Sequence, residues 1–108
     1  MDHELVEKTA GLASRVNNLA MKTTGDFCRQ LLSEQDRLIK LEMVAIVQDL
    51  NSEKPAYKKA VNGLKKAIKA VHEADKEISK VAEAIKQVKQ AVDLVAKVVA
   101  ATAAIAAI

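Results

Sequence analysis

A continuous row of apolar residues in the second half of the chain constrains the fold more than any other feature. Counted in heptads from residue 60 to residue 99, every a position and every d position is apolar. A 3,4 spacing places such side chains on one side of an α-helix, and its persistence over about six heptads is typical of a coiled coil. These twelve residues, called the seam below, are Ala60, Leu64, Ala67, Val71, Ala74, Ile78, Val81, Ile85, Val88, Val92, Val95 and Val99.

The seam predicts one long C-terminal helix over residues 55–108. Proline is tolerated in the first turn of a helix, which suits Pro55, and the residues that follow are mostly strong helix formers such as Ala, Lys and Glu. At 1.5 Å per residue this helix would be about 80 Å long, so the molecule is expected to be elongated. Gly63 is the internal weak point, where a kink is favoured, because Gly costs about 1 kcal/mol relative to Ala in a helix.

The first half of the chain, residues 1–51, predicts a second helical arm with a bend. Apolar residues recur at helical spacing over 5–19 and again over 27–45, with the register moved by one. Between these two runs lies the sequence TTGD, in which Gly25 suits a left-handed conformation at a helix end and Asp26 suits an N-cap. The arm is therefore expected to bend near Gly25, and a complete break there would give the chain three helices.

Residues 51–55, NSEKP, predict the tip of an antiparallel hairpin between the two arms. Folding about this tip would bring Leu5 near residue 100. The chain is long enough for one core, so residues 1–108 are expected to form a single domain. The predicted fold is therefore an all-α, long antiparallel helical hairpin with a coiled-coil seam, which oligomerises into a helical bundle.

The C-terminal stretch KVVAATAAIAAI, residues 97–108, carries no charge after Lys97. A helix needs about twenty apolar residues to cross a bilayer, whereas the eleven residues here span only about 16 Å, so a membrane anchor is disfavoured. A helix that is apolar nearly all round must nevertheless be buried nearly all round. We expect this end to be the buried part of a self-associating bundle, and the alternative is insertion of residues 98–108 into a membrane.

The net charge of +3 is unevenly distributed, with −2 on residues 1–51 and +5 on residues 52–108. Lysines opposite the seam form a basic stripe, which consists of Lys58, Lys59, Lys65, Lys66, Lys69 and Lys76. A stripe of this kind can follow phosphates or anionic lipid head groups. Because this half of the chain lacks Arg and interleaved aromatic residues, nucleic acid is disfavoured and a hydrated outer face is the main expectation.

The residues that could carry chemistry do not form a catalytic or metal-binding pattern. Di-metal sites in four-helix bundles use Glu-x-x-His, but neither His3 nor His72 has a Glu three residues before it. Cys28 has no His nearby in sequence to activate it, and there is no Gly-rich phosphate loop. We therefore expect no enzymatic activity, no metal and no cofactor. The single Cys and the acidic N-terminus favour a cytoplasmic location, with membrane association as the alternative.

Together these features predict a non-enzymatic interaction or oligomerisation module, such as a scaffold, an adaptor or a structural subunit, that acts through the seam. The expected partner is a second copy of the chain or another helical protein, because each seam residue contributes roughly 1.5–3 kcal/mol when fully covered. On this hypothesis Ile85→Asp would disperse the assembly. The alternative is a membrane-active helical protein, such as a pore-forming component, a toxin or its neutraliser, that inserts its C-terminal end.

Overall fold

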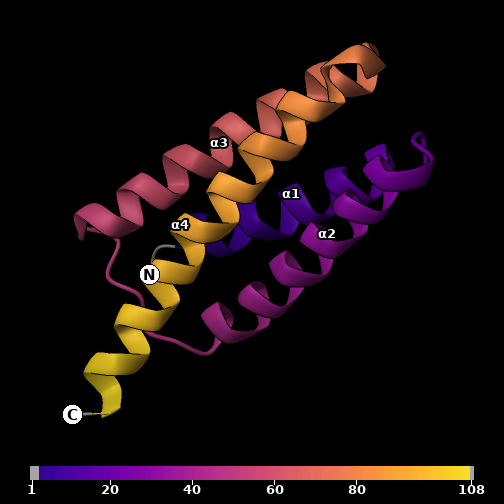
Figure 1. Ribbon diagram of the computed structural model, residues 1–108. Helices are drawn as coiled ribbons and strands as arrows, with labels where there is room; N and C mark the ends of the chain where they lie inside the picture. Colours follow the sequence, from indigo (N-terminus) through magenta and orange to yellow (C-terminus); the bar gives the residue numbers. More distant parts are fainter. Residues whose placement is uncertain (1–2, 108) are drawn as a thin grey trace.

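The computed structural model describes residues 3–107, with side chains described through Thr102, and this part of the chain is all-α. It contains the helices α1 (Glu4–Ala20), α2 (Gly25–Ile46), α3 (Pro55–Lys76) and α4 (Val81–Ala107), with a short 3-10 helix, η1 (Ile78–Lys80), before α4. Figure 1 shows two helical hairpins, α1–α2 and α3–α4, packed side by side. The predicted all-α fold class is confirmed, but the described chain folds as two short hairpins instead of a single long one.

The long helix predicted over residues 55–108 is interrupted after Lys76. Glu77 adopts an extended backbone conformation with φ −138° and ψ 99°, and η1 then leads the chain back so that α4 packs along α3. Residues 72–80 are mostly charged and contain Ile78 as their only large apolar residue. Little apolar burial is therefore lost when the helix ends here. The molecule measures 45 × 20 × 18 Å, which corrects the expected length of about 80 Å.

The predicted pairing of the two halves of the chain is also wrong. Leu5 does not lie opposite residue 100, because its backbone N–H donates to the Tyr57 hydroxyl at 3.1 Å, at the beginning of α3. At the other end of the same helix pair, Lys22 Nζ lies 2.7 Å from Asp75 Oδ1. α1 and α3 are therefore parallel neighbours. Residues 51–54 form part of the connection between the two hairpins and are not a hairpin tip, and Pro55 begins α3 as predicted.

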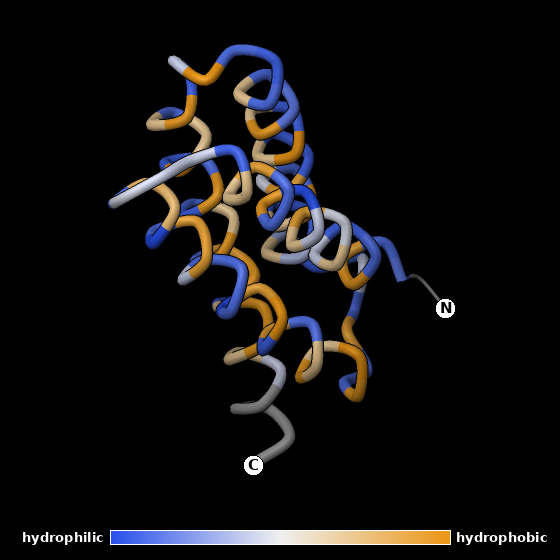
Figure 2. Tube along the Cα trace, turned by 90° about the vertical axis from the view of Figure 1, so that its right-hand side faces the viewer, coloured by the Kyte–Doolittle hydropathy of each residue, from blue (hydrophilic) through white to orange (hydrophobic). Residues whose placement is uncertain are grey.

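The two hairpins stack in the same direction, so α2 and α4 are parallel neighbours as well. Lys89 Nζ donates to Gln30 Oε1 at 3.2 Å, and further along the same pair Gln48 Nε2 donates to the Val99 carbonyl at 3.3 Å. α1 lies diagonally opposite α4, and α2 lies diagonally opposite α3. In Figure 2, apolar and polar residues alternate along each helix with helical periodicity, so that each helix has one side for the core and one for solvent.

The break predicted within the first half of the chain is complete. α1 ends at Ala20, and Gly25 has the left-handed φ of 64° that the sequence predicts for it. The capping role predicted for Asp26 is not observed, because Thr24 occupies the N-cap position of α2. The Asp26 carboxylate instead accepts a hydrogen bond from Gln30 at 2.7 Å and lies 3.6 Å from the Arg29 guanidinium.

The core of the molecule is built from the seam together with one side of α1 and one side of α2. Eleven of the twelve seam residues are buried, whereas Ile78 is 50% exposed at the turn before α4. α3 and α4 approach closely at Gly63, where an added Cβ would lie 2.7 Å from Leu94 Cδ1 and 3.7 Å from Ala91 Cα. α3 runs unbroken through Gly63, so the small residue serves close helix packing and does not produce the predicted kink.

Two seam residues should respond differently to truncation. Leu64→Ala removes a fully buried side chain and leaves a cavity, so we expect the free energy of unfolding to fall by about 2–5 kcal/mol. Ile78→Ala, at the half-exposed position, is the control and should cost less than about 1 kcal/mol. Urea unfolding followed by circular dichroism measures both. Equal losses of unfolding free energy in the two variants would contradict this structure. They would indicate that Leu64 and Ile78 are buried alike, as in a seam shared between two chains.

Two glycine substitutions should change stability in opposite directions. Gly25→Ala introduces a Cβ at a left-handed φ with no atom within 4 Å of it, so the expected loss of about 1 kcal/mol is purely conformational. Gly11→Ala lies inside α1 and meets only the mobile tip of Arg15 at 3.3 Å, so it should gain up to about 1 kcal/mol of helix propensity. The thermal midpoint should fall in Gly25→Ala and rise in Gly11→Ala. A higher midpoint in Gly25→Ala would rule out the left-handed turn.

Candidate interaction surfaces

The structure places the predicted interaction seam inside the chain. Its members on α3 face its members on α4, with α1 and α2 covering the remaining side. Ile85, where an Asp was expected to disperse an assembly, is only 5% exposed. A second chain could reach these residues only by opening the core. An Asp at this position is therefore expected to unfold the single chain.

A row of exposed apolar side chains on α2 takes the place of the seam as the candidate surface. Its residues are spaced by seven, four and three positions, which puts them on one side of the helix, beside the buried row of Leu31 and Leu38. We call this row the α2 stripe: Leu32 (39% exposed), Ile39 (40%), Met43 (65%) and Ile46 (63%). Single exposed apolar residues are ordinary, but a row along four turns of one helix indicates a contact surface.

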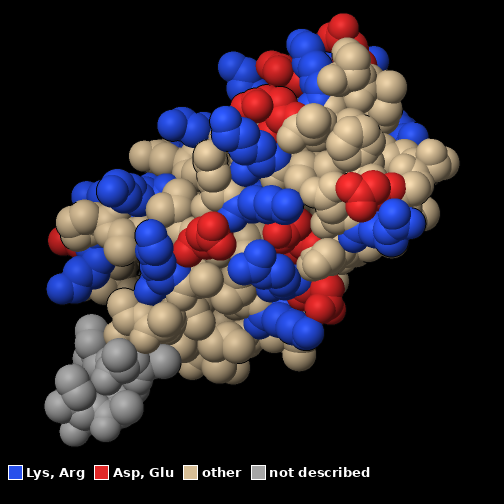
Figure 3. All heavy atoms as spheres, in the orientation of Figure 1, with Lys and Arg blue, Asp and Glu red and all other residues tan. Residues whose placement is uncertain are grey.

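Charges of both signs accompany the α2 stripe. Lys40 Nζ lies 2.9 Å from Asp36 Oδ2, one helical turn away, and both side chains are more than 60% exposed. Next to the end of the stripe, Val47 is the most exposed large apolar residue of the described chain, at 82%. In Figure 3 the surface at the lower edge, over the end of α2, shows neither Lys or Arg nor Asp or Glu. The stripe thus combines an apolar centre with a charged pair on its flank.

The α2 stripe was missed at the sequence level, although a signal for it exists. Leu32, Ile39 and Ile46 recur every seven residues, beside the row of Leu31, Leu38 and Ala45 that the periodicity assigned to the core. Two neighbouring apolar rows on one amphipathic helix exceed what one core-facing side requires. The second apolar row could have been recognised from the sequence. The sequence does not show which of the two rows is buried in the core.

The basic stripe predicted on α3 is brought together on the outer side of the bundle. All six lysines are exposed, and no acidic residue occurs between Lys54 and His72. In Figure 3, Lys and Arg side chains follow the course of α3 along the upper left edge. Within the described chain none of the six forms an ion pair with a carboxylate. These six ammonium groups therefore face solvent and are not neutralised by an ion pair within the described chain.

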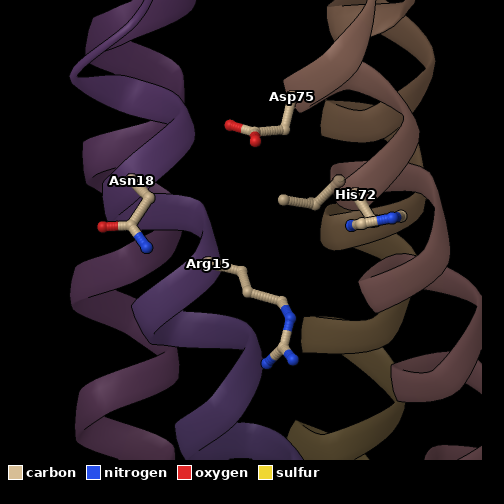
Figure 4. A pocket seen from close by; sticks show the side chains of 5 residues that line it. Arg15, Asn18, His72 and Asp75 are labelled. Carbon is tan, nitrogen blue, oxygen red and sulfur yellow. The ribbon is translucent and has the colours of Figure 1, made fainter.

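A small polar pocket between α1 and α3 gathers Arg15, Asn18, His72 and Asp75 (Figure 4). Its volume is about 80 Å³, well below the roughly 300–1,000 Å³ of ordinary ligand pockets. Asp75 already binds the Lys22 ammonium group at 2.7 Å, and Figure 4 shows the His72 ring pointing away from Asn18. The polar groups here join the two helices and do not converge on a point where a substrate atom could react.

The other residues that could carry chemistry remain apart in the structure. Among the described residues, no three His, Cys, Asp or Glu side chains are grouped so that they could hold a metal ion. Cys28 is a half-buried free thiol on α2.

The C-terminal end of α4 continues beyond its neighbours. Val99 lies level with Gln48, which follows α2, whereas α4 runs on to Ala107 (Figure 1). Within the described part of the chain, no helix is both long and apolar enough to cross a membrane. The side chains of residues 103–108 lie outside the described residues, so both expectations for this end, burial in a bundle or insertion into a membrane, stay predictions.

Comparison of the chain with protein-family models, with curated proteins and with solved structures finds no match in any of the three. The candidate surfaces therefore rest on the geometry and chemistry of the residues themselves.

Proposed function

We propose that this protein is a non-enzymatic helical interaction module that self-associates through the α2 stripe. The observation that carries the proposal is the row of four exposed apolar side chains along one side of α2, each 39–65% exposed. Removing such side chains from water is the main favourable contribution to association. The proposal keeps the predicted role of an oligomerisation module but moves it to another helix, because the seam is used within the chain.

The charged pair beside the stripe favours a second copy of the chain as the partner. A two-fold axis near the middle of α2 would place two α2 helices antiparallel, and a self-complementary interface of this kind is the commonest in homo-oligomers. With the axis near Leu38, Asp36 of one copy faces Lys40 of the other. In the same arrangement Leu32 of one copy lies within one helical turn of Met43 and Ile46 of the other. Each copy can thus exchange its internal ion pair for one across the interface.

The size of the surface predicts a weak to moderate association. Residues 32–46 extend along about 21 Å of helix at 1.5 Å per residue. A stable interface usually buries about 800 Å² on each partner, more than one helical stripe supplies unless its neighbours join the contact. We therefore expect monomers and dimers in exchange, with a population that depends on concentration.

The experiment is a measurement of mass by light scattering over a range of protein concentrations. The wild-type chain should approach twice its single-chain mass of 11.7 kDa at the highest concentration. Ile39→Lys should weaken the dimer at least about tenfold, because each substitution enters a two-fold interface twice. Val44→Lys is the matched control: Val44 lies on the same helix with nearly the same exposure, 44% against 40%, but outside the stripe.

Circular dichroism of the two variants shows whether both remain folded, which separates loss of association from loss of structure. A wild-type chain that stays monomeric at every concentration would refute the proposal. Equal weakening by Ile39→Lys and Val44→Lys would refute it too, because the effect would then not depend on the stripe.

A further inference from the structure

A groove between α3 and α4 lies on a different part of the surface from the α2 stripe. It has a volume of about 290 Å³ and is open to solvent along one side. Gly63 and Leu94 form its apolar floor, where the two helices approach most closely. We call it the lysine groove, and its polar lining consists of Lys59, Asn62, Lys66, Gln87 and Gln90.

The lining of the lysine groove supplies hydrogen-bond donors and positive charge but no carboxylate. Lys59 and Lys66 stand two helical turns apart on the same side of α3, and neither forms an ion pair in the described chain. Asn62 lies between them in sequence, and the two Gln side chains come from α4. Two acidic residues of α4 lie close to the groove in sequence: Glu83 Oε1 accepts a hydrogen bond from Gln87 at 2.9 Å, and Asp93, next to Leu94, lies 3.6 Å from the Arg37 guanidinium.

The charge around the groove reinforces that of its lining. The α3–α4 hairpin carries ten Lys against five acidic residues, while the α1–α2 hairpin carries six basic and six acidic residues. The fold therefore concentrates the net positive charge on one hairpin. A positive surface of this kind raises the local concentration of anions and speeds their association.

We propose that the lysine groove binds a compact polyol phosphate, either free in solution or as the head group of a lipid. Phosphate oxygens are acceptors for the ammonium groups of Lys59 and Lys66 and for the side-chain amides between them. The C–H face of a small ring can rest on Leu94, which packs against the half-buried Gly63. A volume of about 290 Å³ lies at the small end of ligand pockets, which suits one ring with its phosphates.

A compact phosphate fits the groove better than a nucleic acid does. Both lysines lie on the α3 side of a short groove, only two helical turns apart, and none of the groove residues is aromatic. Binding of single strands depends on aromatic platforms on which successive bases stack.

The experiment titrates the full chain with inositol hexakisphosphate by calorimetry at about 0.15 M salt, where weak surface attraction is screened. We expect saturable binding of one ligand per chain. Lys59→Gln combined with Lys66→Gln should weaken it on the order of a hundredfold, because each hydrogen bond from a charged group is worth about tenfold or more. Arg15→Gln combined with Arg29→Gln removes the same charge from exposed positions of the α1–α2 hairpin outside the α2 stripe and should leave binding within about twofold.

A second experiment shows whether the phosphate is free in solution or part of a lipid head group. Phosphatidylcholine vesicles with and without phosphatidylinositol bisphosphate are sedimented with the protein, and inositol hexakisphosphate is added as competitor. Retention by the bisphosphate vesicles that the competitor reverses assigns a lipid head group, whereas binding of the free phosphate alone assigns a soluble ligand. Both results support the lysine groove.

Three results would overturn the inference. The first is the lack of saturable binding of inositol hexakisphosphate. The second is an equal loss in the two double variants, which would show that net charge alone attracts the anion. The third is tighter binding of duplex DNA whose strength grows with duplex length, which would make the basic stripe a nucleic-acid surface. Because the tested lysines lie on α3 and the dimer variants on α2, failure here leaves the proposed self-association untouched.

Discussion

The close packing of α3 against α4 is the constraint on which the rest of this structure depends. Small residues at the d positions of α3, such as Ala67, and the bare backbone at Gly63 let α4 approach within van der Waals contact. The seam residues of α3 and those of α4 cover each other. One apolar side of the α3–α4 hairpin remains, and the α1–α2 hairpin packs on it. It docks with α1 along α3 and α2 along α4, and the ends of these pairs are joined by hydrogen bonds such as that from Leu5 to Tyr57.

This arrangement places the two proposed binding surfaces on different hairpins. The α1–α2 hairpin has equal numbers of basic and acidic residues and carries the α2 stripe, which suits contact with another apolar surface. The α3–α4 hairpin carries the excess of positive charge and the lysine groove, which suit an anion. The two surfaces belong to different hairpins, so the proposed self-association through α2 would leave the groove lysines of α3 uncovered.

Local features of the fold could be predicted from the sequence because they depend on neighbouring residues. The helical content follows from composition and periodicity, the turn near Gly25 follows from the conformational freedom of glycine, and the outward position of lysines such as Lys66 follows from their place opposite the seam. The pairing of helices could not be predicted in the same way. The heptad repeat continues through Ile78, so nothing in its periodicity marks the turn that reverses the chain there.

The sequence by itself determined that this chain is helical, that its core would be made of Ala, Val, Leu and Ile, and which residues could line a helix contact. Only the tertiary structure decided that the seam closes upon itself within one chain and that the α2 stripe stays open. The physical reason is that an apolar row specifies a need for burial but not the surface that satisfies it. A partner segment in the same chain, held at high effective concentration by a short turn, satisfies that need before a second chain can.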